Sequence, residues 1–415
     1  MKPLIYLYQE QLQEFLNTKN EVVGAAYEWK NESVYHAYFD YPVVAPTGFP
    51  SPCLFSLGPQ NIETVITNLL NSKPTDRKYS YVLGIQFSID NKTVSKRGVV
   101  FDGTEFKEAD VKYVPTKSEL YSRSKGLLEV DALEKKRVLI VGLGSGGSSI
   151  AMELAKAGIG NFTLVDFDRI ELHNIARHIC GVNELGRLKT NAVKDAILLK
   201  NPYAKIKTYN FNIDQHLDVI ENEVLEADLT IAATDNNSSR FYLNDFLLKH
   251  QKTGLFGRAV TRAEGGDVLK VRPGGPCYAC LLGSDWYVRE EEVSDINRAR
   301  ESGIIRQYHS DEDAQAIAQV GLSTDIMPIN TMMVKLALLE LSRNTKCEIS
   351  SLDAELTYDF YMWANRRDKH FKEWIPFNNI PDTSKPIVSQ KIPTILQWYG
   401  VKFSKVKECM VCNNG

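Results

Sequence analysis

From residue 137 onward, the hydrophobic positions follow two alternating patterns. Short apolar runs such as RVLIVG and NFTLVDF are typical of buried strands, whereas the apolar residues of SSIAMELAKAG recur at helical spacing. The predicted strands cover 137–142, 161–167, 205–213 and 227–235, and the predicted helices cover 148–158, 187–201, 238–251 and 330–343. Strands that alternate with helices predict an α/β fold with a Rossmann-like, mostly parallel sheet and helices on both faces.

The pattern divides the chain into three predicted parts. Residues 1–118 are predicted to be a separate α+β domain because they contain a helix-like run at 10–16, strand-like runs at 21–29, 33–39 and 79–89, and a Pro-rich loop at 41–53. Residues 119–350 form the alternating α/β domain. Residues 351–415, with aromatic strand-like runs and Pro-rich turns, form a C-terminal extension. The highly charged segment 284–320 is expected to be an exposed helix or a mobile loop.

Composition and charge narrow the classes of function. The chain has 415 residues, of which 43% are hydrophobic and 24% charged, as is usual for a globular protein. A formal net charge of −3 provides no general basic field for nucleic acid. The apolar runs are too short to span a bilayer, and charge comes too early in the N-terminal sequence for a signal peptide. We therefore expect a cytoplasmic protein without a nucleic-acid or membrane partner.

A glycine-rich turn follows the first predicted strand of the α/β domain. Gly142, Gly144 and Gly147 form the pattern GxGxxG, in which glycines permit a tight turn and a close approach of phosphate to the backbone. Asp166 ends the next strand about 20 residues later, where a ribose hydroxyl would be held. The turn predicts an adenine nucleotide without distinguishing NAD from ATP, and a purely structural turn is the alternative.

Polar residues beyond the turn favour ATP. A triphosphate needs cations and a Mg²⁺ ligand, and Arg177 and Lys189 are candidate cations. Asn174 can form a hydrogen bond with a phosphate or ribose oxygen. Asp235 follows an apolar strand at the carboxyl edge of the sheet, where a single carboxylate suits Mg²⁺. Each residue alone is more often a solvated surface group, so the prediction depends on their joint placement.

These motifs identify a family resemblance over residues 120–345. The segment resembles the ThiF/MoeB/HesA adenylyltransferases, a superfamily that includes the ubiquitin-activating enzymes. The matching motifs occur in the family's order and are YSR at 121–123, VLIVGLGSGG, LVDFDRIELHNIAR, GRLK at 186–189, ATDN at 233–236 and a pair of CxxC motifs.

The resemblance implies a role for each matching residue. It implies that Asp166 holds the ATP ribose, that Asp235 binds Mg²⁺, and that Arg123 reaches the ATP of the partner in a homodimer. The phosphate contacts that it implies are Asn174, Arg177 and Lys189, and Asp168 and Asn236 in the same motifs are taken as further nucleotide contacts. His178 departs from the family, which usually has Gln there, and we expect this change to be tolerated.

The two CxxC motifs predict a metal site. Cys277 and Cys280 lie about 130 residues before Cys409 and Cys412, and four thiolates suit a closed, structural Zn²⁺ site. The family also carries this pair of motifs. Such a site would tie the end of the chain to the α/β domain. Two exposed redox pairs are the alternative.

Three further cysteines bear on a thioester step. Ubiquitin-activating relatives carry a cysteine after the first CxxC motif, but no cysteine occurs at 281–346 here. The enzyme could stop at the adenylate, use another cysteine, or carry a substitution, for which the residues just before Gly321 are the place to look. Cys180 and Cys347 are expected to be buried or incidental thiols, and Cys53 a core residue.

The resemblance implies ATP-dependent adenylation of the C-terminal carboxylate of a ubiquitin-like protein ending in glycine. Segment 256–274 is expected to guide the substrate tail, with glycines that suit its close passage. A conjugating-enzyme partner and a bacterial pathway are implied. Residues 1–118 are interpreted as an accessory or docking module, and a passive scaffold or a dimerisation element is equally consistent with their sequence. The alternatives are adenylation of a sulfur-carrier protein, peptide or tRNA base, an NAD-dependent oxidoreductase, and a non-catalytic docking protein.

Overall fold

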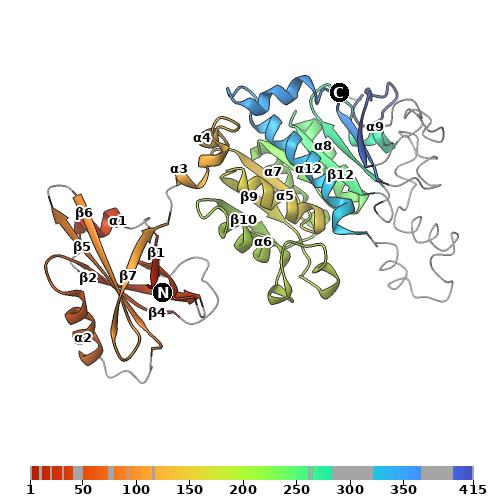
Figure 1. The fold of residues 1–415 in the computed structure, drawn as a ribbon. Coiled ribbons are helices and arrows are strands. Elements are labelled where there is room, and N and C mark those ends of the chain that lie inside the picture. Colours follow the sequence, from red (N-terminus) through yellow and green to blue (C-terminus); the bar gives the residue numbers. More distant parts are fainter. Residues whose placement is uncertain are drawn as a thin grey trace, which may run out of the picture. The chain divides into compact units, whose positions relative to one another are not determined.

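The computed structural model describes residues 2–8, 12–18, 21–29, 32–40, 50–72, 79–90, 93–114, 117–259, 263, 265–282, 321–365 and 396–413. The charged segment 284–320, with the residues just before Gly321, therefore lies outside the described residues. The chain divides into two compact units, Met1–Ser122 and Arg123–Gly415, each with its own sheet and hydrophobic core (Figure 1).

The first unit is a closed barrel with the strand order β1-β3-β2-β4-β5-β6-β7. Its elements are β1 (Leu4–Leu7), α1 (Leu12–Thr18), β2 (Glu21–Trp29), β3 (Val34–Tyr38), β4 (Ser51–Leu57), α2 (Ile62–Ser72), β5 (Val82–Asp90), β6 (Thr93–Phe101) and β7 (Phe106–Tyr113). Parallel pairing of β1 with β7 closes the barrel and leaves no open edge between them.

The end of the predicted Pro-rich loop proved to be a strand. Ser51, Pro52 and Cys53 open β4 instead of continuing the loop. Pairing of β4 with β5 begins only at Cys53, so the missing N–H of Pro52 leaves that ladder complete. Proline is tolerated at the start of a strand for this reason.

The second unit contains an eight-stranded sheet of order β10-β9-β8-β11-β12-β13-β14-β15. The strands are β8 (Arg137–Val141), β9 (Asn161–Val165), β10 (Lys205–Tyr209), β11 (Leu229–Ala232), β12 (Gly254–Ala259), β13 (Gly265–Val271), β14 (Phe360–Ala364) and β15 (Gln397–Val401). The first five in this order are parallel, and the last three are antiparallel additions. Strands of the C-terminal extension therefore continue the sheet of the α/β domain.

Helices cover both faces of this sheet, and the predicted α/β fold is confirmed. One face carries α5 (Ser145–Lys156), α6 (Lys189–Leu198) and α12 (Ser323–Leu341), and the other carries α7 (Leu217–Glu226), α8 (Asn237–Lys249) and α9 (Tyr278–Leu282). The short helices α3 (Lys117–Leu120) and α4 (Val130–Leu133) precede β8. Within β8, Val138 and Ile140 enter one core while Leu139 and Val141 enter the other, as a doubly covered strand requires.

The parallel strands place three loops at one edge of the sheet. The loops that begin at Gly142, Asp166 and Ala233 follow the carboxyl ends of β8, β9 and β11, which are neighbouring strands. In open α/β sheets, ligands bind at this edge.

Among the helices that the structure describes, none combines the length and apolar character that a membrane crossing needs.

Candidate functional site

The glycine-rich turn connects β8 to α5. Gly142 has a φ of +89°, and a Cβ there would lie 2.7 Å from the carbonyl oxygen of Ala233. A Cβ on Gly147 would lie 1.9 Å from the carbonyl oxygen of Gly142, so α5 starts directly against the turn. A Cβ on Gly144 would have nothing within 4 Å. Packing therefore requires Gly142 and Gly147, whereas Gly144 leaves room for a ligand to reach the backbone.

The N-terminus of α5 lies at this opening. Gly144 is its N-cap, and no side chain caps the helix. The N–H groups of the first turn and the helix dipole favour an anion at such a position. The hydroxyl of Ser145 donates a hydrogen bond to the carbonyl oxygen of Arg177 at 3.1 Å, which holds segment 172–178 beside the start of the helix. The GxGxxG pattern gives no sign of this role of Ser145.

Asp166 follows β9 and fixes the glycine turn through its carboxylate. Oδ2 accepts a hydrogen bond from the N–H of Leu143 at 2.6 Å, and Oδ1 accepts one from the N–H of Asp168 at 2.8 Å. Burial raises the pKa of Asp166, while the charge of Lys189 and these two N–H donors oppose the rise. An ionised carboxylate has about four acceptor sites, so Asp166 can also accept a ribose hydroxyl.

Lys189 is the first residue of α6 and is almost completely buried. Its Nζ lies 2.6 Å from Oδ2 of Asp168, and its N–H donates to the carbonyl oxygen of the same residue at 3.0 Å. Asp168 therefore binds both the side-chain ammonium group and the backbone N–H of Lys189. The structure gives Asp168 a role that the sequence motif does not specify, as the counter-ion of the predicted phosphate-binding cation.

Asn174 and Arg177 lie in one turn near α5. Oδ1 of Asn174 accepts a hydrogen bond from the N–H of Glu171 at 3.0 Å, and this bond caps the 3₁₀ helix Leu172–Asn174. The carbonyl oxygen of Asn174 accepts from the N–H of Arg177 at 2.9 Å. Both side chains are half-buried. The amide oxygen of Asn174 thus has a structural partner, and a nucleotide contact would use another lone pair or the NH₂ group.

His178, the departure from the family pattern, contacts the glycine turn. Its Nδ1 accepts a hydrogen bond from the N–H of Cys180 at 3.1 Å, so Nε2 carries the proton and donates to the carbonyl oxygen of Leu143 at 2.8 Å. Burial lowers the pKa of His178, which favours the neutral ring. Glutamine also has a donor and an acceptor, so the two residue types can serve the same turn.

The loop after β11 carries the predicted Mg²⁺ ligand. Asp235 is exposed, and Asn236 is the N-cap of α8. Oδ1 of Asn236 accepts from the N–H of Ser239 at 3.0 Å and from its hydroxyl at 2.6 Å. The cap fixes the backbone that follows Asp235, while the Asp235 carboxylate faces solvent. Arg123, in the 3₁₀ turn Ser122–Ser124, is exposed as well.

Two glycines of segment 256–274 lie directly against α12. A Cβ on Gly257 would lie 2.1 Å from Sδ of Met333, and a Cβ on Gly266 would lie 2.2 Å from Cδ1 of Ile329. Both glycines let α12 pack closely on the β12–β13 hairpin. Helix-on-sheet packing therefore accounts for these two glycines. Residues 260–262 and 264 of the segment lie outside the described residues, and its expected guidance of a substrate tail stays a prediction.

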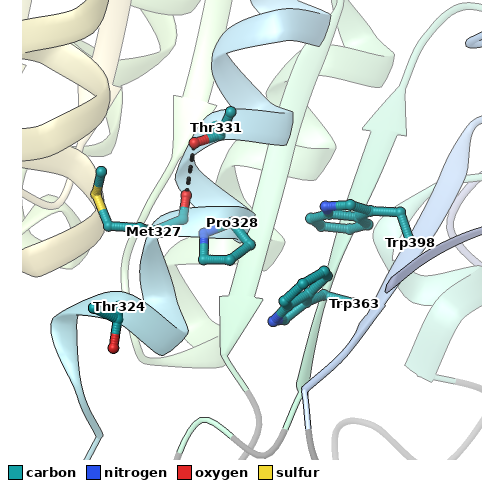
Figure 2. Close-up of a pocket in the computed structure, with 6 residues that line it drawn as sticks. All are labelled: Thr324, Met327, Pro328, Thr331, Trp363 and Trp398. Carbon is teal, nitrogen blue, oxygen red and sulfur yellow. Dashed lines mark hydrogen bonds between the residues drawn. The ribbon is translucent and has the colours of Figure 1, made fainter. Parts of the chain in front are cut away.

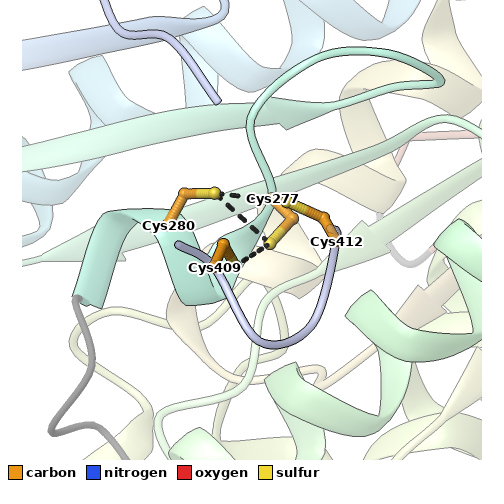
Figure 3. Close-up of side chains that lie close together, drawn as sticks. All are labelled: Cys277, Cys280, Cys409 and Cys412. Carbon is orange, nitrogen blue, oxygen red and sulfur yellow. Dashed lines mark hydrogen bonds between the residues drawn. The ribbon is translucent and has the colours of Figure 1, made fainter. Parts of the chain in front are cut away.

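The four cysteines of the CxxC motifs lie together (Figure 3). Cys277 directly precedes α9 and Cys280 lies within it, and Cys409 and Cys412 come from the C-terminal loop. Their Sγ atoms lie 3.7 Å apart in the pairs 277–280 and 277–409 and 3.5 Å apart in the pair 280–412. Four sulfurs at about 2.3 Å from a tetrahedral Zn²⁺ would be about 3.8 Å apart. The arrangement fits Zn²⁺, and the predicted grouping is confirmed.

The electrostatics of this cluster also favour a cation. The Cys277 thiol donates to Cys280 and lowers the pKa of Cys280 to about 4, whereas burial raises the pKa of Cys412 to about 12. Unaided, the crowded thiols cannot all ionise together, because each thiolate opposes the next. A divalent cation would stabilise all four as thiolates.

The remaining cysteines have the surroundings of structural thiols. Cys53 is fully buried in the barrel core, and Cys180 is buried beside α6. Burial raises the pKa of Cys53 well above its usual value and that of Cys180 to about 12. Cys347 is half-buried in a turn after α12. Thiols with raised pKa values are poor nucleophiles at neutral pH, so neither Cys53 nor Cys180 has the environment of a thioester-forming residue.

An apolar pocket of about 510 Å³, which no sequence motif indicated, lies on the α12 face (Figure 2). Its lining residues are Thr324, Met327, Pro328, Thr331, Trp363 and Trp398. The two indole rings come from β14 and β15, with centroids 5.6 Å apart. Asn330 of the same helix lies 3.2 Å from where a Cβ on Gly146 would be, so α12 also packs against the glycine turn. The signal in the sequence that could have indicated this pocket was the tryptophans near the end of the chain, which lie in short runs without helix or strand periodicity.

Together, the fold and the carboxyl-edge loops define a nucleotide-binding α/β enzyme. Residues 119–360 match the model of the ThiF family. Molybdopterin-synthase adenylyltransferase of Escherichia coli is 31% identical over 226 residues, 53% of this chain and 88% of the relative. Ubiquitin-like modifier-activating enzyme 5 of Caenorhabditis elegans is 28% identical over 37% of this chain and 39% of the relative. The solved structure of E. coli MccB with ATP has a TM-score of 0.45 and 16% identity over 68% of each chain.

The chain belongs to the ThiF family, because the family match covers more than half of its length. It is an ATP-dependent adenylyltransferase, as relatives that bear this name indicate. Both statements confirm what the motifs predicted. The family match begins at residue 119 and therefore does not cover the N-terminal barrel.

Proposed function

We propose that this adenylyltransferase activates the C-terminal carboxylate of a ubiquitin-like or sulfur-carrier protein. The observation that carries the proposal is the meeting, at one sheet edge, of an open helix N-terminus at Gly144, a buried cation at Lys189 and an exposed carboxylate at Asp235. Relatives named molybdopterin-synthase adenylyltransferase, and adenylyltransferase and sulfurtransferase UBA4, support a sulfur carrier in particular.

The proposed reaction needs little acid–base chemistry. A carboxylate oxygen of the carrier forms a bond to the α-phosphorus of ATP, and the bond from that phosphorus to the bridging oxygen of pyrophosphate breaks. Pyrophosphate leaves with the electron pair, and the carrier becomes an acyl adenylate. Because a C-terminal carboxyl group is already ionised at pH 7, no general base is required. Catalysis then depends on position and on neutralising the charge that develops on pyrophosphate.

We assign nucleotide binding and charge neutralisation to different residues of the site. Asp166 would hold the ribose, and the N-terminus of α5 would bind phosphate oxygens through backbone N–H groups. Arg177 and Lys189 would neutralise phosphate charge, with Lys189 held in place by Asp168. Asp235 would bind Mg²⁺, which, when bound, neutralises further charge on the phosphates. Asn174 and Asn236 hold the backbone of the two loops that carry these groups.

The cysteine cluster has a structural role in this proposal. Cys277, Cys280, Cys409 and Cys412 would hold one Zn²⁺ with a closed shell of four thiolates, which leaves no open position for catalysis. The ion would fasten the C-terminal loop to α9. This role agrees with the position of the cluster on the α8–α9 face of the sheet.

The finer proposal is that the enzyme belongs to a bacterial ubiquitin-like conjugation pathway. The carrier would end in glycine, a conjugating enzyme would be a second partner, and the barrel would dock one of them. A second copy of the chain would supply Arg123 to the phosphates. These proposals come from the family resemblance. The relatives named ubiquitin-like modifier-activating enzyme 5 support only a ubiquitin-like carrier.

Exchange of radioactive pyrophosphate into ATP in the presence of a candidate carrier protein tests the proposed reaction. Asp235→Ala should lower the exchange rate by about 10²–10³-fold, because a charge-stabilising group at the phosphates is lost. Asp218→Ala, an exposed carboxylate in the first turn of α7, is the matched control and should leave exchange unchanged. Full exchange by Asp235→Ala, or undiminished exchange with a carrier whose C-terminus is amidated, would contradict the proposal.

A further inference from the structure

The loop that carries Asp235 is supported from behind by the helix of the cysteine cluster. Tyr278 lies between Cys277 and Cys280 at the start of α9 and is completely buried. Its N–H donates a hydrogen bond to Oδ1 of Asn244, a fully buried residue of α8, at 2.8 Å. Its ring stacks on Phe256 of β12 with centroids 5.2 Å apart. These contacts fix the position of the tyrosine ring.

The hydroxyl of Tyr278 connects to the first turn of α8. It donates a hydrogen bond to Oδ1 of Asn237 at 2.7 Å and accepts one from Nη1 of Arg240 at 3.4 Å. Nδ2 of Asn237 is buried and has no partner among the described residues, so this hydroxyl orients the amide. Asn237 is only two residues from Asp235.

Arg240 carries the connection to the other end of the loop. Its Nη2 donates to the carbonyl oxygen of Thr234, the residue before Asp235. The Thr234 side chain is held as well, because its Oγ1 accepts from the hydroxyl of Ser239 at 2.8 Å. A Cβ on Gly142 would lie 2.9 Å from the nitrogen of Thr234, so this loop also packs on the glycine turn. The hydroxyl of Tyr278 therefore contacts two side chains that hold the loop on either side of Asp235.

We propose that Tyr278 is a positioning residue for the nucleotide site. The four cysteines fix the place of Tyr278, and its hydroxyl, through Asn237 and Arg240, fixes loop 233–237 and the direction of the Asp235 carboxylate. Without the hydroxyl, the Asn237 amide loses its partner and Arg240 loses one of its acceptors. The loop then samples more conformations, and nucleotide binding with Mg²⁺ must restore the order. This proposal rests on the proposed role of Asp235.

The test removes only the hydroxyl, with Tyr278→Phe in the full chain. Calorimetry would measure binding of Mg²⁺ together with an ATP analogue that has a methylene bridge between the α- and β-phosphates. We expect about tenfold weaker binding, the factor that corresponds to one net hydrogen bond, and faster hydrogen exchange at 233–239. Zinc content and melting temperature should stay close to those of the original protein. Tyr361→Phe is the control, because Tyr361 is a buried tyrosine of β14 whose hydroxyl accepts a hydrogen bond from the backbone N–H of Tyr358.

Two results would overturn the proposal. Unchanged analogue binding and unchanged exchange at 233–239 would mean that the loop does not depend on the hydroxyl. Loss of zinc together with the loss of binding would mean that Tyr278 supports the metal site instead of the loop. If Tyr278→Phe does not fold, Asn237→Ala tests the same hydrogen bond from the other side and must weaken analogue binding to a similar extent. Failure of the original protein to bind the analogue would reject the proposed function itself, which distinguishes the two failures.

Discussion

At the scale of single residues, Leu143 shows how the glycine-rich turn is held. Asp166 accepts a hydrogen bond from the N–H of Leu143, and His178 donates one to the carbonyl oxygen of Leu143. The turn is therefore bonded on both sides by side chains from the segment that follows β9. A turn held in this way needs little rearrangement when a phosphate binds, which is the condition for effective electrostatic stabilisation.

The neutral state of His178 leads to a prediction for pH dependence. Burial lowers the folded-state pKa of His178 below its usual value of 6.5, so the unfolded chain binds its proton first as the pH falls. The contribution of neutral His178 to the stability of the folded state is complete above pH 6.5. It is lost as the pH falls from there through the folded-state pKa. The charge of Lys189 also lowers the pKa of His178, whereas the charge of Asp166 raises it.

Melting temperatures from pH 7.5 to 5.0 test this prediction. In His178→Gln, which keeps a donor for Leu143 but cannot titrate, the loss of stability below pH 6.5 should be smaller than in the original protein. His173→Gln is the control, since His173 is exposed. Parallel pH curves for the original protein and His178→Gln would contradict a neutral, buried His178.

The glycines show what a motif can predict at this scale. The pattern GxGxxG correctly located the turn between β8 and α5. It could not separate the roles of the three glycines, because these depend on Ala233 and on the start of α5, which only folding brings close. The counter-ion role of Asp168 has the same origin, since Lys189 is 21 residues away in the sequence.

At the scale of elements, the antiparallel strands of the sheet attach the C-terminal part of the chain to the rest of the α/β unit. β14 and β15 extend the sheet beyond β13, and a buried charged cluster joins β13 to α12 and to the residue that precedes β14. In this cluster, Nζ of Lys270 lies 3.2 Å from Glu340 and 3.7 Å from Asp359. Removing one partner of such a buried cluster leaves an uncompensated charge. The cysteine cluster is a second attachment, between α9 and the C-terminal loop.

The proposed zinc site predicts a metal-dependent attachment. Metal analysis of the purified protein should give about one zinc per chain, and Cys409→Ser should lose it, because three thiolates hold Zn²⁺ less well than four. Its melting temperature should fall, and protease should remove the C-terminal loop faster. Cys347→Ser, at a thiol outside the cluster, should change neither property. A metal-free protein of full stability would contradict the assignment.

At the scale of the whole molecule, the chain consists of a barrel unit and an α/β unit. Arg123 is the first residue of the second unit and is exposed. The family resemblance implies that this arginine serves the phosphates of a second copy. An arginine supplied by a partner can stabilise transition-state charge strongly, so the site would be complete only in the dimer.

Mixed dimers test the shared site. Arg123→Ala and Lys189→Ala should each be nearly inactive in pyrophosphate exchange. A mixture of the two variants should recover activity, because a mixed dimer has one site with both residues intact. Two preparations of Arg123→Ala mixed together are the control and should stay inactive. Absence of recovery in mixed dimers, verified by mass spectrometry, would reject supply of Arg123 by the partner.

The sequence by itself determined the α/β fold, the family and the grouping of the four cysteines. Apolar strands covered on both faces and closely spaced motifs are local signals, so they can be read without knowing the fold. The two CxxC motifs are far apart in the chain, and their grouping was predictable because a closed Zn²⁺ shell needs four thiolates. Tertiary structure alone decided that β1 pairs with β7 to close the barrel, that α12 needs Gly257 and Gly266, and that Tyr278 contacts the loop of Asp235. Each of these depends on segments far apart in the chain, and their contacts exist only after packing has brought the segments together.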